Sequence, residues 1–196
     1  MFAITTRFRS AAVLVAAALS LIGAAPLGST SGSAQPLLTQ MLGTWTVVQR
    51  MWPGPAAVAI ALPSAVAKRR LIGNAFLQEE MTQASGLVGT SFTRVAYLNY
   101  NPISRTWEYV SLDTRAPQVM NERGIASNAT DGLNLNGGRF VAAQWGPHKN
   151  VAFRYRLVVG PVRSDRQVVS LFLTPLSFAP TKEFRAFEYV YTRAPK

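Results

Sequence analysis

Apolar and polar residues alternate along most of the chain after residue 35, in short segments separated by turn-forming residues. The clearest case is the segment 151–159, in which every second residue is apolar: Val151, Phe153, Tyr155, Leu157 and Val159. Successive side chains of a strand point to opposite faces, so this segment is predicted to be a strand with one buried face and one wet face.

Turn signals such as Gly73-Asn74, Asp131-Gly132 and Gly137-Gly138 recur at short intervals. Between them lie segments rich in Val, Thr and aromatic residues, which is typical of consecutive antiparallel strands. The segments that we predict to be strands are 44–51, 68–82, 91–100, 105–113, 117–126, 138–145, 151–159, 166–174 and 183–193.

Two further segments do not follow the strand pattern. Leu37–Leu42 looks like a helical turn, whereas Ala56–Val66 is apolar without a clear period and receives no assignment. Pro63 argues against a continuous helix or a central strand there, because proline lacks a backbone N–H.

Nine strands without covering helices would leave unpaired sheet edges, and closure into a barrel removes them. The fold class predicted is therefore all-β, an antiparallel up-and-down barrel of about eight to ten strands, and a barrel of that size can hold one small ligand.

The N-terminal residues have the pattern of a secretory signal peptide. A start with Arg7 and Arg9 is followed by the apolar stretch 11–22 and then by small residues up to Ala34. We therefore expect residues 1–34 to be a signal peptide with a small-residue spacer, residues 35–196 to form a single barrel domain, and the protein to be exported to the periplasm or the cell exterior.

Composition narrows the possible chemistry. The chain has no Cys and one His, which excludes disulfides, thiolate metal sites and multi-histidine metal centres. We expect no metal, no cofactor and no catalytic residues. His148 lies in a predicted turn, and no motif for nucleophilic catalysis or phosphate binding is present. Asp113 and Glu108 are the acids that a barrel enzyme would use.

The chain is strongly basic, with 20 Lys and Arg against 9 Asp and Glu, a formal net charge of +11. Its arginines are scattered along the strands and not gathered in one stripe, which argues against a nucleic-acid partner. A basic surface would attract anionic envelope lipids or cell-wall polymers instead. The sequence does not indicate an oligomeric state.

Two motifs at the ends of the predicted barrel carry a family resemblance. Leu42-Gly43-Thr44-Trp45 opens the first strand, and Tyr191-Thr192-Arg193 closes the last. The chain resembles the calycin (lipocalin-like) barrels and, more narrowly, a secreted bacterial family of uncharacterised calycin-like domains. Asn99 and Asn101 depart from that family's usual Gly-Tyr-Asp. The resemblance implies the barrel fold and no particular activity.

The same motifs have a physical interpretation. Gly43 permits a tight turn into the barrel, Trp45 would plug that end, and the guanidinium of Arg193 would lie over the indole ring. We predict this stacked pair within about 6 Å.

Several residues, mostly aromatic, are expected at inward positions of the central strands, where they could line a ligand cavity or fill the core. These candidate ligand-binding residues are Tyr97, Trp107, Tyr109, Asp113, Trp145, Phe153 and Tyr155. The function predicted is non-catalytic binding of a small apolar or amphipathic molecule. The alternatives are an envelope protein with a filled barrel that docks on anionic lipid or polymer, and a barrel enzyme with a buried acid.

Overall fold

The computed structural model describes residues 34–84, 91–128, 132–146 and 148–195 as one short helix and ten strands. Their bounds are α1 Ala34–Gln40, β1 Gly43–Met51, β2 Ile60–Ile72, β3 Phe76–Gln83, β4 Thr93–Asn101, β5 Thr106–Asp113, β6 Ala116–Asn128, β7 Gly132–Trp145, β8 His148–Val159, β9 Arg166–Pro175 and β10 Phe184–Arg193. The predicted signal peptide lies almost wholly outside the described residues.

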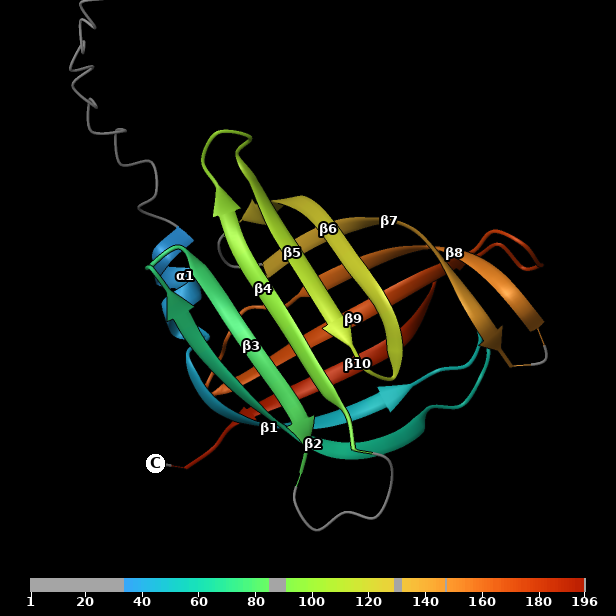
Figure 1. Cartoon of the computed structure of the whole chain (residues 1–196), viewed down its shortest axis with the longest axis horizontal. Coiled ribbons are helices and arrows are strands. Elements are labelled where there is room, and N and C mark those ends of the chain that lie inside the picture. The colour runs from blue at the N-terminus through green and yellow to red at the C-terminus, as the bar shows by residue number, and fades with distance from the viewer. Residues whose placement is uncertain (1–33, 85–90, 129–131, 147, 196) are drawn as a thin grey trace, which may run out of the picture.

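The ten strands form a closed antiparallel barrel in which each strand pairs with the next and β10 pairs with β1 (Figure 1). Closure is direct, because Trp45 of β1 lies opposite Arg193 of β10. This confirms the predicted all-β up-and-down barrel. In the described part of the chain, no helix has the length and apolarity needed to cross a membrane.

Strand alternation places the core inside the barrel. In β8 the inward residues Val151, Phe153, Tyr155, Leu157 and Val159 are all buried, whereas Arg154 is exposed. The inward faces of the ten strands form one apolar cluster. Leu38 of α1 and Met41, the residue directly after α1, belong to the same cluster. The helix lies at one end of the barrel (Figure 1). The helical turn expected over Leu37–Leu42 is thus found slightly earlier in the chain.

The expectation of one strand over 68–82 is wrong. The chain turns sharply within it, at Gly73 and Asn74, whose φ angles of 58° and 59° lie in the left-handed region. β2 and β3 pair across this turn, with Ile72 opposite Phe76. β2 also includes most of the unassigned segment 56–66. Pro63 is tolerated there because the pairing with β1 shifts register between Val47 and Gln49, so its missing N–H falls at a bulge.

Gly137-Gly138 is not the turn that the sequence indicates. Both glycines lie inside β7, where the pairing with β8 shifts register between Asn136 and Arg139. The ring of Tyr155 occupies the space beside Gly137, and a Cβ there would lie 2.0 Å from that ring. The glycine therefore allows an aromatic residue of the neighbouring strand to pack against the backbone.

Candidate functional site

The barrel interior has a filled half, next to α1, and a hollow half at the opposite end. Trp45 closes the filled half: it is fully buried, and its Nε1 donates a hydrogen bond to the carbonyl of Met41. Arg193 Cζ lies 4.3 Å from the centroid of the indole, which confirms the predicted stacked pair. The same guanidinium donates hydrogen bonds to the carbonyls of Gln40 and Leu42, so it ties the last strand to the segment before the first.

A buried charge network fills the middle of the barrel around Glu79. Its carboxylate accepts from Arg69 Nε at 2.7 Å, Arg94 Nη1 at 3.2 Å and the Tyr191 hydroxyl at 3.2 Å. Burial alone would raise the pKa of Glu79, but the two guanidinium groups outweigh it and hold the pKa below its usual value. Arg94 also donates to the Tyr109 hydroxyl. This half of the barrel is packed by its own side chains.

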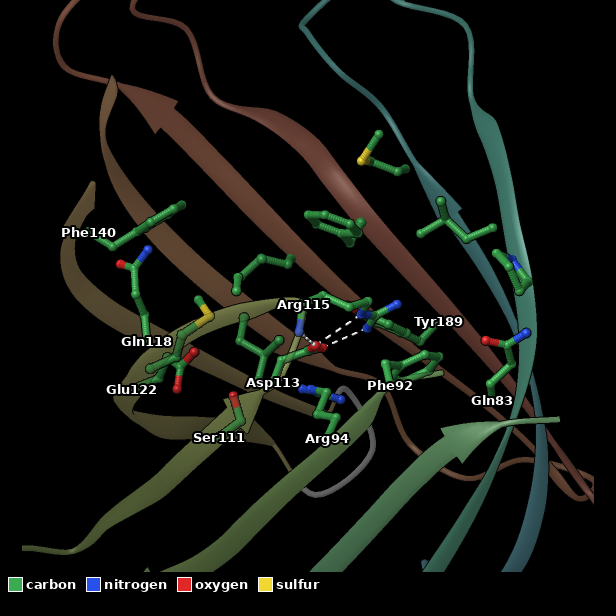
Figure 2. A pocket seen from close by; sticks show the side chains of 18 residues that line it. Gln83, Phe92, Arg94, Ser111, Asp113, Arg115, Gln118, Glu122, Phe140 and Tyr189 are labelled. Carbon is green, nitrogen blue, oxygen red and sulfur yellow. Dashed lines mark hydrogen bonds and ion pairs between the residues drawn. The ribbon is translucent and has the colours of Figure 1, made fainter. Parts of the chain in front are cut away.

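Beyond this network the barrel encloses a cavity of about 480 Å³ (Figure 2). Met51, Gln83 and Asp113 lie at strand ends far from α1 and surround its mouth. The apolar wall consists of side chains from β7 to β10, in which Leu171 pairs with both Leu157 and Phe187. Its main members are Phe140, Leu157, Leu171, Phe187 and Tyr189.

The opposite wall is polar and is formed by β4, β5 and β6. Arg94, Ser111 and Glu122 are buried inward-facing residues on these three adjacent strands. Figure 2 shows them along one side of the cavity. In the sheet register, Arg94 lies opposite Asp113 and Glu122 lies opposite Tyr109. Ser111 lies midway between Asp113 and Tyr109 on β5, so Arg94, Ser111 and Glu122 form a diagonal row across the three strands. The cavity is therefore amphipathic, with hydrocarbon on one side and hydrogen-bonding groups on the other.

Glu122 is the least satisfied polar group of this wall. It is 1% exposed, and its Oε2 has no hydrogen-bond partner among the described residues. Burial raises the pKa of this carboxyl to about 8, although the positive charge of Arg94 acts in the opposite direction. The carboxyl is thus mostly protonated at neutral pH and can donate a hydrogen bond into the cavity.

A charged pair lies at the mouth of the cavity. Arg115 donates to both carboxylate oxygens of Asp113, at 2.9 Å from Nε and 2.6 Å from Nη2 (Figure 2). Burial raises the pKa of Asp113, but the hydrogen bonds from Arg115 outweigh this and lower the pKa overall. The Arg115 guanidinium also covers the ring of Phe92, with Cζ 3.8 Å from its centroid. Asp113 is therefore a paired rim residue.

A model of a protein family matches residues 30–193, which include α1 and all ten strands. This family is described as a protein of unknown function, DUF1579. The chain belongs to the DUF1579 family. No curated protein matches the chain.

Of the candidate ligand-binding residues on β4 and β5 of the DUF1579 barrel, the one on β4 faces outward and the two aromatic ones on β5 face inward. Tyr97 faces outward, next to Gln78 of β3, so its expected inward orientation is wrong. In β4 the inward-facing residues are Arg94, Ala96 and Leu98, because Arg94 forms an ion pair with the buried Glu79 inside the barrel. Trp107 and Tyr109 of β5 do face inward: Trp107 packs against Tyr100, and Tyr109 belongs to the charge network.

The predicted β7 and β8 residues form an aromatic cluster in the DUF1579 core. Trp145 contacts Phe153 at 5.1 Å between ring centroids, and its Nε1 donates to the carbonyl of Pro53. Phe153 is fully buried, and the Tyr155 hydroxyl bonds to the backbone of Asn121. Within the described part of the chain, Asp113 alone of the seven candidates lines the large cavity.

Sequence reasoning missed the polar wall of the DUF1579 cavity. In β6 Glu122 occupies the parity opposite to Val119 and Ile125, so the apolar pattern alone would place Glu122 on the outer face. The structure leaves those two apolar residues 66% and 68% exposed and buries the glutamate.

Proposed function

We propose that this DUF1579 protein is a non-catalytic binding protein that holds a small apolar or amphipathic molecule in the hollow half of its barrel. The observation that carries the proposal is the cavity of about 480 Å³ with one apolar wall. Small-molecule sites are typically concave, largely apolar and supplied with a few polar groups for orientation, at volumes of about 300–1,000 Å³.

The division of the interior supports this assignment. The buried charge network and the Trp45 plug make one half of the barrel rigid and closed, so a ligand has access through the other end. A calycin-like relationship is part of the proposal and is supported by Gly43, Trp45 and the stacked Arg193. Export is likewise proposed, on the pattern of the N-terminal residues.

The two alternative functions, an envelope docking protein and a barrel enzyme, are judged by different features of the structure. The docking hypothesis assumes a filled barrel, and the cavity removes that assumption. A barrel enzyme is favoured by one feature, the buried carboxyl of Glu122 in the cavity wall, whose pKa burial raises to about 8. The acids first considered for such an enzyme contribute less: Glu108 is on the outer face, near Arg123 and Asn101, and Asp113 is held by Arg115.

The test is to block the cavity and measure binding. Leu171→Trp places an indole ring in the cavity, whereas Ile125→Trp adds the same ring on the outer face. An environment-sensitive naphthylamine dye should bind the wild-type protein and the Ile125 variant, and should not bind the folded Leu171 variant. Native mass spectrometry of protein from its own envelope would then identify a co-purifying molecule. Equal dye binding by all three proteins would refute the proposal.

A further inference from the structure

The polar wall contains a buried oxygen atom that the described part of the protein does not satisfy by itself. Glu122 Oε2 is buried and has no hydrogen-bond partner among the described residues, and the Ser111 hydroxyl belongs to the same wall of the cavity. Both side chains are almost fully buried and line the same cavity. Because buried polar groups normally have partners, the unpartnered Glu122 oxygen, on a strand next to that of the cavity-lining Ser111 hydroxyl, indicates that a ligand atom completes this wall.

The charged groups of this cavity are already paired. Arg94 is bound to Glu79, and Arg115 is bound to Asp113. Among the buried residues of the polar wall, the groups left for a ligand are therefore the hydroxyl of Ser111 and the carboxyl of Glu122. An ionised carboxylate without a directly bound cation would be costly at a site that is 1% exposed, so burial favours the neutral form of Glu122 at neutral pH, and this form carries an O–H donor.

We propose that Glu122 and Ser111 form a polar subsite that donates hydrogen bonds to the carbonyl oxygen of an uncharged ligand head group, such as an ester, ketone or amide. The hydrocarbon part of that ligand then lies against Leu157 and Leu171 on the opposite wall. This assignment rests on the proposed binding function and adds the chemical class of the ligand. It makes Glu122 the residue that determines specificity.

The same geometry makes binding depend on pH. The ionisable groups that act on Glu122 are Arg94 from β4, Tyr109 from β5 and Tyr155 from β8, whereas its direct neighbour on β7 is Gly137, which carries no charge. Burial places the Glu122 pKa at about 8. As pH rises through that value the carboxyl loses its proton and can no longer donate to a carbonyl oxygen, so binding should weaken.

The experiment compares three ligands that share one hydrocarbon chain: methyl octanoate, octanoate and octylamine. Each displaces the dye from the full-length protein between about pH 6 and pH 9.5, a range that spans the titration of Glu122. Glu122→Leu removes the subsite, Glu122→Gln keeps an N–H donor that does not titrate, and Ser111→Ala removes the second donor. Glu108→Gln, a glutamate of the outer face, is the matched control.

The expected result is that methyl octanoate binds most tightly at neutral pH and weakens about tenfold in Glu122→Leu and about threefold in Ser111→Ala. Its affinity should fall at alkaline pH in the wild type and the Glu108 control, and stay level in Glu122→Gln. Tightest binding of octylamine would assign a cation site to Glu122, and tightest binding of octanoate would assign an anion site to Arg94. Either result overturns the proposal.

Two outcomes separate this inference from the proposed function. If the dye binds but the three ligands compete equally and the Glu122 variants behave as wild type, the subsite is wrong and the ligand-binding barrel stands. If neither the dye nor any of the ligands binds, the proposed function itself fails. Thermal unfolding of each variant establishes that the protein is folded, and Glu122→Gln, which is nearly isosteric, remains informative if Glu122→Leu is not.

Discussion

Between about pH 4.5 and about pH 8 the stability of the barrel should fall as pH rises, because folding buries Glu122. The carboxyl has a pKa of about 8 in the folded protein against 4.5 for an ordinary glutamate. The folded state therefore binds the proton more tightly than the unfolded chain does. Its contribution to stability is fully present below about pH 4.5 and is lost progressively up to about pH 8.

The magnitude follows from the size of the shift. Each pH unit within that window lowers the free energy of unfolding by about 1.4 kcal/mol, so the whole window amounts to about 5 kcal/mol. That is a large part of the total stability of a typical domain, about 5–15 kcal/mol. Glu122→Gln removes the titrating group at nearly constant shape. The variant should equal the wild type near about pH 5 and exceed it by several kcal/mol at about pH 9.

The assay is urea unfolding followed by tryptophan fluorescence at several pH values. The quantity of interest is the difference in free energy of unfolding between Glu122→Gln and the wild type, because other titrating groups cancel in it. Ser111→Ala, which changes the same wall without removing a titratable group, should differ from the wild type by a constant amount. A Glu122→Gln difference that does not change with pH would contradict the assigned burial and protonation of this carboxyl.

Three further substitutions and one control test the rest of the barrel, each by thermal or urea unfolding. Glu79→Gln leaves two buried guanidinium groups without their shared counter-ion and should cost about 3–5 kcal/mol; a loss below 1 kcal/mol would show that the network is solvated. Arg193→Ala removes the cation over the indole and two hydrogen bonds to the segment before β1, and should cost about 1–3 kcal/mol. Gly137→Ala should cost at least about 1–3 kcal/mol because its Cβ would overlap the Tyr155 ring, whereas the adjacent Gly138→Ala meets open space and should be tolerated; equal effects would disprove the packing described.

The barrel could be predicted from the sequence because its strands alternate locally. A segment such as 151–159 reports its own buried face, and each strand needs only its nearest neighbours in the chain as partners. The closing pair of Trp45 and Arg193 could also be predicted, because a glycine and two residue types at the barrel ends specify it. The merged segment 68–82 shows the limit: a connection of only three residues, 73–75, separates β2 from β3 there, and so short a turn is easily included in a single predicted strand.

The candidate site could not be predicted from local patterns because, in β4 and β6, the face that looks apolar in the sequence is the outer face of the barrel. In β4 the parity with Val95 and Tyr97 looks like the buried face, yet Arg94 is inside because Glu79 of β3 is there to pair with it. In β6 the same reversal buries Glu122. The pairing of charges across strands, and the division of the interior into filled and hollow halves, depend on contacts between segments and are not visible in either segment alone.

The two described ends of the chain emerge at the same end of the barrel, opposite the mouth of the cavity. The helix before β1 lies there, and Arg193 at the end of β10 binds carbonyls just ahead of β1. A fusion partner, affinity tag or surface linkage attached directly before Ala34 or after Pro195 would therefore start at the end of the barrel away from the opening through which the proposed ligand would enter. Immobilisation at either of these two points would leave the mouth of the cavity unobstructed in a biosensor measurement.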